Sequence, residues 1–149
     1  MTDEDRDVNG YTGDYGSMLK TFKKYQALLN AVVDCSMFVG QQQVLGVDSK
    51  GNGYMADGQG GFTTVTGTLS FGACFGSTEA DYVNLALATG GAAWDIRQLR
   101  QGGKIADSFT AAFVDIKVGE ITTPVPEAGT LALLGIGLMG FGFVRRRRE

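Results

Sequence analysis

Histidine is absent from the 149-residue sequence. Without imidazole, neither a Ser-His-Asp nor a Cys-His catalytic arrangement can form, and zinc sites that need histidine are excluded. Cysteine is scarce as well, because Cys35 and Cys74 are the only two and cannot make a four-cysteine metal site. The sequence therefore predicts no cofactor, and no enzyme of these classes.

The two cysteines leave two interpretations open. In an exported protein, Cys35 and Cys74 are candidates for a disulfide, since oxidising compartments allow one to form. Otherwise they are buried thiols that behave as small hydrophobic side chains. The sequence does not give the distance between their Cα atoms, which decides whether a bond is possible.

Charged residues are few, at 19%, whereas glycine is abundant, with 23 residues. This composition favours a β-rich extracytoplasmic domain. Four of the 13 basic residues, Arg145, Arg146, Arg147 and Arg148, stand together at the end of the chain. Setting these aside, with Glu149, leaves 9 basic and 15 acidic residues in the body. An acidic body argues against nucleic-acid binding, which needs clustered Lys and Arg on the folded domain.

The C-terminal segment from residue 123 has three parts in sequence. Pro124, Val125, Pro126 and Glu127 form a stretch that cannot be helical throughout, because proline restricts its own φ and its predecessor. An uncharged, mainly apolar run follows from Ala128 to Val144, and as a helix it would reach about 25 Å, the short end of what crosses a bilayer. The arginine cluster then ends the segment.

This segment is interpreted as a transmembrane helix. The alternative, a buried C-terminal helix of a soluble protein, would need an apolar surface on every side. Arginines at the end of an apolar run instead indicate a membrane stop, and they are expected on the cytoplasmic side with the body outside.

Pro126-Glu127, the Gly/Leu-rich apolar run and the terminal arginines closely resemble the PEP-CTERM sorting signal of Gram-negative bacteria. The resemblance implies recognition by an exosortase, a membrane-embedded cysteine protease or transpeptidase, and cleavage near Pro126-Glu127. It also implies transient insertion in the inner membrane, then release or attachment at the outer surface in an exopolysaccharide or biofilm matrix. Ala128 stands where the family has a second proline.

The opening residues, M-T-D-E-D-R-D-V-N-G, are acidic and polar, unlike a signal peptide. We expect that the natural start lies upstream, with an atypical export route as the alternative. A tail-anchored protein without a signal peptide is a third possibility, although it would place the arginines outside.

Three other motifs are weak. Gly135, Gly137 and Gly140 spell G-x-G-x-x-G inside the apolar run, where no βαβ unit can follow. Asp5, Asp7 and Asn9 match half of a calcium loop, but Gly16 occupies the position of the bidentate carboxylate. A second fragment, from Asp48 to Gly53, has Lys50 at a ligand position, so polar turn chemistry is the better interpretation for both.

The predicted body, residues 1–122, is an antiparallel β-sandwich of jelly-roll type that precedes the sorting signal at 123–149. Helical spacing of Met18, Phe22, Tyr25, Leu29 and Val32 predicts an amphipathic helix over 18–33. Strands are predicted at 62–71, 82–89, 92–99 and 109–118, and a hairpin with a glycine-rich loop at 41–61. Trp94 is predicted in the core.

Capping or surface roles are predicted for four further carboxylates, because none of them forms an evident acid/base pair. They are Asp81, Asp95, Asp107 and Asp115. The leading hypothesis is a non-catalytic envelope or matrix protein that is sorted by an exosortase, with exopolysaccharide as a candidate partner. Two alternatives stay open: a single-pass membrane protein whose tail is never cleaved, and a carbohydrate-active enzyme on a β-sandwich.

Overall fold

The computed structural model describes residues 14–122 of the chain. The chain divides into two units, residues 1–116 and 117–149. The helices are α1 (Tyr15–Lys24), the π-helix η1 (Glu79–Val83), α2 (Asn84–Ala88), α3 (Ile96–Arg100) and α4 (Gly103–Thr122). The strands are β1 (Ala31–Val33), β2 (Ser36–Val39), β3 (Gln42–Val44), β4 (Gly46–Asp48), β5 (Asn52–Ala56), β6 (Phe62–Thr66), β7 (Leu69–Gly72) and β8 (Ala92–Asp95).

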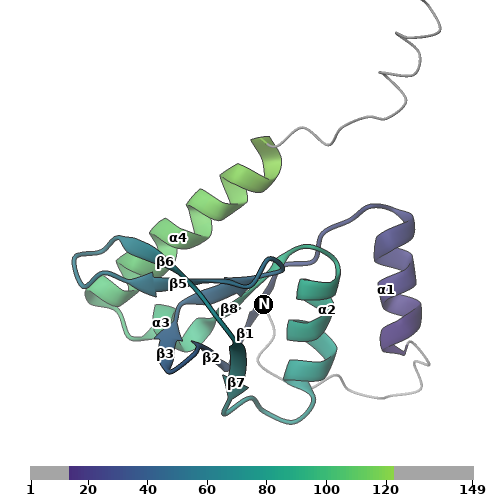
Figure 1. The fold of residues 1–149 in the computed structure, drawn as a ribbon, viewed down its shortest axis with the longest axis horizontal. Helices are drawn as coiled ribbons and strands as arrows, with labels where there is room; N and C mark the ends of the chain where they lie inside the picture. Colours follow the sequence, from purple (N-terminus) through teal and green to yellow (C-terminus); the bar gives the residue numbers. More distant parts are fainter. Residues whose placement is uncertain (1–13, 123–149) are drawn as a thin grey trace, which may run out of the picture. The chain divides into compact units, whose positions relative to one another are not determined.

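The strands form two sheets (Figure 1). The larger has the order β1-β8-β4-β5-β6, and the smaller has the order β3-β2-β7. Pairing is antiparallel throughout both sheets except between β1 and β8, which run parallel with Ala31 opposite Ala93. A parallel pair needs a long crossover, and here the chain between β1 and β8 builds the rest of both sheets.

The first hydrophobic core lies between the two sheets. It joins Val33, Met37, Val44 and Val47 from the strands to Val83 of η1, and all five are fully or almost fully buried. Successive side chains of a strand point to opposite faces of its sheet, so every second residue of a strand can be buried in this core.

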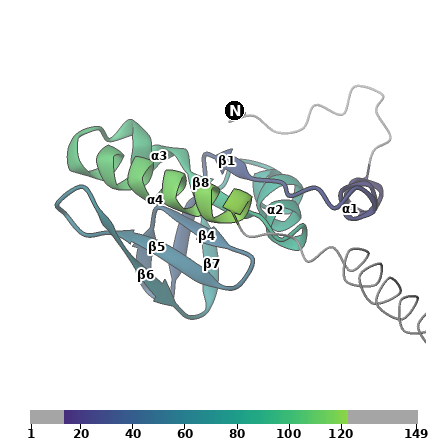
Figure 2. The ribbon, with the colours of Figure 1, turned by 90° about the horizontal axis from the view of Figure 1, so that it is seen from above.

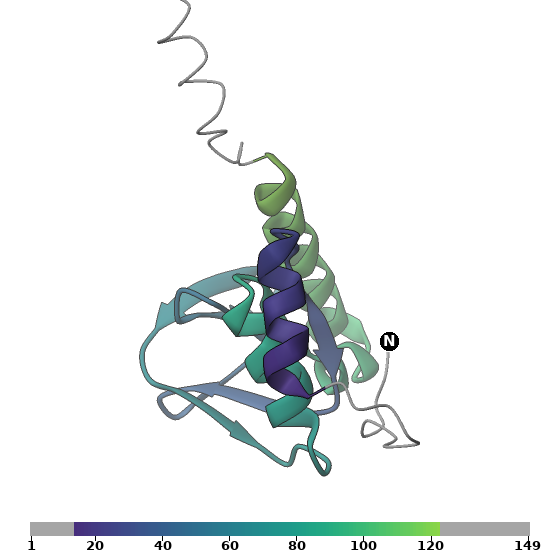
Figure 3. The same ribbon diagram turned by 90° about the vertical axis from the view of Figure 1, so that its right-hand side faces the viewer.

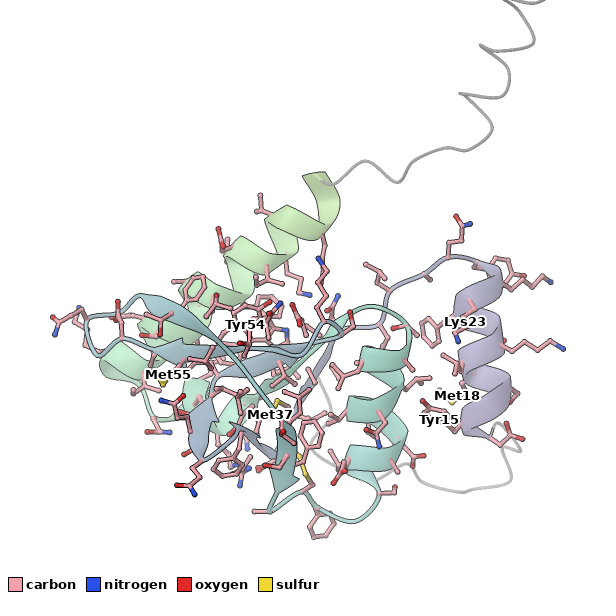
Figure 4. All side chains as sticks on the ribbon, in the orientation of Figure 1. Tyr15, Met18, Lys23, Met37, Tyr54 and Met55 are labelled. Atoms are coloured by element: carbon pink, nitrogen blue, oxygen red, sulfur yellow. A yellow bond between two sulfur atoms is a disulfide. The ribbon has the colours of Figure 1, made fainter. Side chains whose placement is uncertain are left out.

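The second core lies on the other face of the five-stranded sheet, which α4 covers (Figure 2). Trp94 is completely buried there and stacks on Tyr54, with ring centroids 5.5 Å apart. Phe109 and Phe113 of α4 meet the Trp94 ring edge-on. Tyr54 and Met37 thus belong to separate cores (Figure 4), and the predicted core position of Trp94 is confirmed.

The expected β-rich class, with antiparallel sheets and some helices, is confirmed. The arrangement differs from a jelly roll in two ways. The larger sheet is mixed, since it contains the parallel β1–β8 pair. One of its faces is covered by the helix α4 rather than by a second sheet.

Two predicted strands are helices in the structure. Residues 109–118 lie within α4, and residues 82–89 lie in η1 and α2. The apolar residues Ile105, Phe109, Ala112, Phe113 and Ile116 recur at steps of three and four, so they form the buried stripe of a helix. The segment 109–118 was predicted as a strand because it follows the Gly102-Gly103 turn, but its helical period decides the structure. Of the predicted strand 92–99, only β8 is extended, and the segment 62–71 is two strands, β6 and β7.

The predicted helix 18–33 is shorter than expected. Helix α1 begins after Asp14, whose carboxylate accepts a hydrogen bond from Ser17 N at 2.6 Å, and it ends at Lys24. Gln26 then adopts a left-handed φ of 51°, and Ala27 N bonds to Phe22 O, which closes the helix as a C-terminal cap. Residues 31–33 pair with β8 instead, so sheet pairing overrides their helical spacing.

Within residues 14–122, no helix has the length and apolar character needed to cross a membrane. The predicted transmembrane helix, from Ala128 to Val144, lies outside the described residues. The boundary between a body at 1–122 and a sorting signal at 123–149 stays a prediction.

Candidate functional site

Cys35 and Cys74 form a disulfide, so that interpretation of the two cysteines is confirmed. The bond joins the residue before β2 to the segment after β7, across 39 positions of sequence. Cys35 is fully buried in the first core, and Cys74 is half-buried beside it. Because β2 and β7 are also paired in the small sheet, the disulfide reinforces that pairing.

A buried carboxylate, that of Asp95, lies at the end of β8. It caps α3, since one of its oxygens accepts from Arg97 N at 3.0 Å and from Arg97 Nε at 3.1 Å. The second oxygen lies 3.4 Å from Gln98 Nε2. Asp95 is 0% exposed, so these donors replace the water that an ionised carboxylate would otherwise need.

Arg97 connects this carboxylate to the segment around the disulfide. Its Nε lies 3.0 Å from an oxygen of Asp34, and its Nη2 donates to Ser36 Oγ at 2.7 Å. Arg100, one turn further along α3, reaches the other oxygen of Asp34 at 3.2 Å. We call the set Asp34, Ser36, Asp95, Arg97 and Arg100 the Arg97 cluster.

The Arg97 cluster is balanced in charge, with two carboxylates and two guanidinium groups. Asp34 and Asp95 both accept charge-assisted hydrogen bonds from arginine. What the cluster does is structural: it ties β8 and α3 to the residues on both sides of Cys35. The capping role expected for Asp95 is confirmed.

A second carboxylate, Asp48, organises the tight turn between β4 and β5. Burial raises its pKa, but donors overcome this effect: Asn52 donates through both its backbone N and its Nδ2, and Lys50 N and Tyr54 Oη also donate. The net result is a pKa below the usual value. The polar turn expected from Asp48 to Gly53 is confirmed. The Asp48 carboxylate accepts its hydrogen bonds from groups within this turn and from Tyr54.

An open groove of about 520 Å³ lies between α1 and the η1–α2 segment, which run side by side (Figures 1 and 3). Tyr15, Ala80 and Asn84 line it, and Tyr15 Oη donates a long hydrogen bond of 3.4 Å to Asn84 O. The side chains of Tyr15 and Met18 point from α1 toward α2 (Figure 4). None of these three described lining residues is charged.

Among residues 14–122, no group of three His, Cys, Asp or Glu side chains is placed to hold a metal ion. The weak calcium candidates Asp5, Asp7 and Asn9 lie outside the described residues. So do the sorting motif Pro124, Val125, Pro126, Glu127 and Ala128, and the stop cluster Arg145, Arg146, Arg147 and Arg148. These assignments stay predictions at the level of individual residues.

Comparison with known protein families identifies the tail. Residues 124–148 match the PEP-CTERM protein-sorting motif. The chain therefore carries this sorting signal, which is typical of proteins that are exported to the cell envelope or surface and processed by an exosortase. No curated protein and no solved structure matches the chain.

The Arg97 cluster was not found by sequence reasoning. Its partners are far apart in sequence, since Arg97 and Ser36 are separated by 61 positions and Arg100 and Asp34 by 66. One local signal was present in the sequence. Asp95 directly precedes Ile96 and is a typical N-cap residue, and the side chain of Arg97, two residues later, can donate a hydrogen bond to its carboxylate.

Proposed function

We propose that this protein is a non-catalytic component of the bacterial envelope or extracellular matrix, held briefly in the inner membrane and then cleaved by an exosortase. The observation that carries the proposal is the match of residues 124–148 to the sorting motif. In this proposal the segment from Ala128 to Val144 crosses the membrane and the arginines stay in the cytoplasm. Cleavage within Pro124–Ala128 then frees the body at the outer surface of a Gram-negative cell, where it contributes to a biofilm matrix.

Two features of the body support this proposal. The disulfide between Cys35 and Cys74 is a bond that persists in oxidising compartments, as expected after export. The carboxylates of Asp48 and Asp95 are engaged in a turn and in a helix cap, which are structural roles.

The test is intact mass and cell fractionation of the protein in host cells with and without the exosortase. We expect a shortened product, in the outer membrane or medium, only in the strain with the enzyme. Glu127→Gln should lower the processed fraction, whereas Glu149→Gln, the same change outside the matched residues, should leave it unaltered. Full-length protein in the inner membrane of both strains would contradict exosortase processing.

A second candidate is a permanently anchored single-pass membrane protein. The observation that favours it is Ala128, which replaces the second proline of the family's motif. Ala128→Pro separates the candidates: if the missing proline prevents cleavage, this substitution should create a processed product that the wild type lacks.

A further inference from the structure

Strand β6 is an edge of the five-stranded sheet. Among the described elements, only β5 lies along it, in a register that places Tyr54 opposite Thr64 and Ala56 opposite Phe62. Figure 2 shows β6 outside β5, at the border of the sheet. The far side of β6 is therefore available for pairing with another strand.

Backbone hydrogen bonds of β5 show which groups of β6 point outward. Tyr54 O accepts from Leu45 N at 2.7 Å, so the backbone groups of Tyr54 are directed to β4 and away from β6. The opposite residue, Thr64, accordingly directs its own N–H and C=O away from β5. Since the direction alternates along a strand, Phe62 and Thr66 do the same.

Strand β6 also lacks the features that usually protect an edge. Natural edge strands carry lysine, proline, a bulge or an inward charge, which discourage pairing with other chains. The sequence of β6, F-T-T-V-T, contains no charge and no proline, and its pairing with β5 is regular over five positions. Thr63, Thr64 and Thr66 are exposed to solvent.

We propose that β6 pairs antiparallel with β6 of a second copy of this chain, about a two-fold axis at Thr64. Phe62 then lies opposite Thr66 of the partner copy, and Thr63 lies opposite Val65. The outward groups of Phe62, Thr64 and Thr66 on both strands supply six backbone hydrogen bonds, two for each of the three opposed pairs. No like charges meet, and threonine pairs and Thr–Val pairs are favourable across strands.

The pairing joins two five-stranded sheets into one continuous sheet. A contact made by one short strand is smaller than a standard protein–protein interface, so the dimer is weak and depends on concentration. The two acidic bodies repel each other, with 9 basic against 15 acidic residues each when the terminal arginines and Glu149 are set aside. Dimerisation therefore strengthens as added salt screens this repulsion.

Sedimentation velocity of the full chain in mild detergent, over a range of protein concentrations, tests the pairing. Thr64→Pro removes an outward N–H without touching the bonds to β5, and Thr64→Lys opposes two charges at the axis. Thr64→Pro should weaken dimerisation about tenfold or more, as the loss of the two hydrogen bonds between the Thr64 residues implies. Thr64→Lys should weaken it as well, because like charges directly opposite one another repel. Thr68→Lys, the same change just beyond β6, is the matched control and should dimerise like the wild type.

Cross-linking distinguishes this geometry from association through the apolar tail. Cα atoms of a hydrogen-bonded antiparallel pair are about 5.5 Å apart, which a disulfide can span. Thr64→Cys should therefore form a covalent dimer on oxidation, and Thr68→Cys should not. Equal cross-linking of both, a wild type that stays monomeric at every concentration, or an equal effect of Thr68→Lys would overturn the proposal.

Discussion

The indole ring of Trp94 lies directly against Gly46, its partner across the β4–β8 pair. A Cβ atom built at position 46 would be 2.5 Å from Cε3 of Trp94 and 2.7 Å from Ala93 O. The ring is enclosed on the remaining sides by Tyr54, Phe109 and Phe113. Only a glycine lets β4 approach β8 this closely, so position 46 controls the packing of the second core.

Gly46→Ala is the first prediction. The added methyl group must displace Trp94 or separate the two strands, so we expect a loss of about 1–3 kcal/mol in the free energy of unfolding, the usual cost of overpacking a core. Urea unfolding followed by tryptophan fluorescence measures this directly, since Trp94 is the only tryptophan in the sequence.

The same substitution at Gly119 is the control. Gly119 lies within α4, and a Cβ built there meets nothing within 4 Å. Gly119→Ala should therefore stabilise the helix by up to about 1 kcal/mol, from helix propensity alone. If both alanine variants changed stability in the same direction, the close contact between Gly46 and Trp94 would not be the reason that position 46 requires glycine.

Reduction of the disulfide is the second prediction. The bond between Cys35 and Cys74 spans 39 positions, and the chain-entropy relation gives a stabilisation of about 4 kcal/mol for a loop of that length. Urea midpoints with and without reductant should differ accordingly. The double variant Cys35→Ala/Cys74→Ala should match the reduced wild type and be insensitive to reductant, whereas equal midpoints for the oxidised and reduced wild type would contradict the expectation.

The third prediction concerns acid sensitivity. The folded-state pKa of Asp48 lies below its ordinary value of 3.8, so the unfolded chain binds the proton more readily. Asp48 therefore contributes stability that is complete above the ordinary value and is lost as pH falls from 3.8 through the lower folded-state pKa.

Tyr54→Phe tests the cause of that shift. The substitution removes the Oη donor to Asp48 but keeps the ring that stacks on Trp94. The Asp48 pKa should rise, as measured by an NMR titration of its carboxyl carbon. Tyr82→Phe, a tyrosine in η1, should leave the titration curve of Asp48 in place, and an unchanged curve in Tyr54→Phe would show that the hydroxyl has no part in the shift.

The parts of this protein that were predicted correctly from sequence are those encoded locally. The sorting motif is a continuous run of residues, from Pro124 to Arg148, and needs no fold to be recognised. Trp94 is large, apolar and unique, so burial was the simplest expectation for it. The polar turn at Asp48 also depends on neighbours within six positions.

The parts that were missed depend on distant residues. The parallel pairing of β1 with β8 joins positions about sixty residues apart, and this pairing converts the end of an expected helix into a strand. The segment 109–118 has a helical period of its own, but the surface that its apolar stripe packs against includes Trp94 of the strand β8. The Arg97 cluster likewise exists only when β8 and α3 meet the residues beside Cys35.

The last prediction concerns that cluster. Arg97→Ala leaves the fully buried Asp95 carboxylate without its guanidinium partner, so we expect a loss of about 2–4 kcal/mol in the free energy of unfolding. Arg100→Ala removes an arginine whose side chain is 51% exposed, and its loss should be about 1 kcal/mol or less. Arg97→Lys keeps the charge but not the planar fork that reaches Asp34, Asp95 and Ser36 together, so its stability should fall between the two. Urea unfolding of the three variants gives this order, and an Arg97→Ala variant as stable as Arg100→Ala would show that water, rather than Arg97, satisfies Asp95.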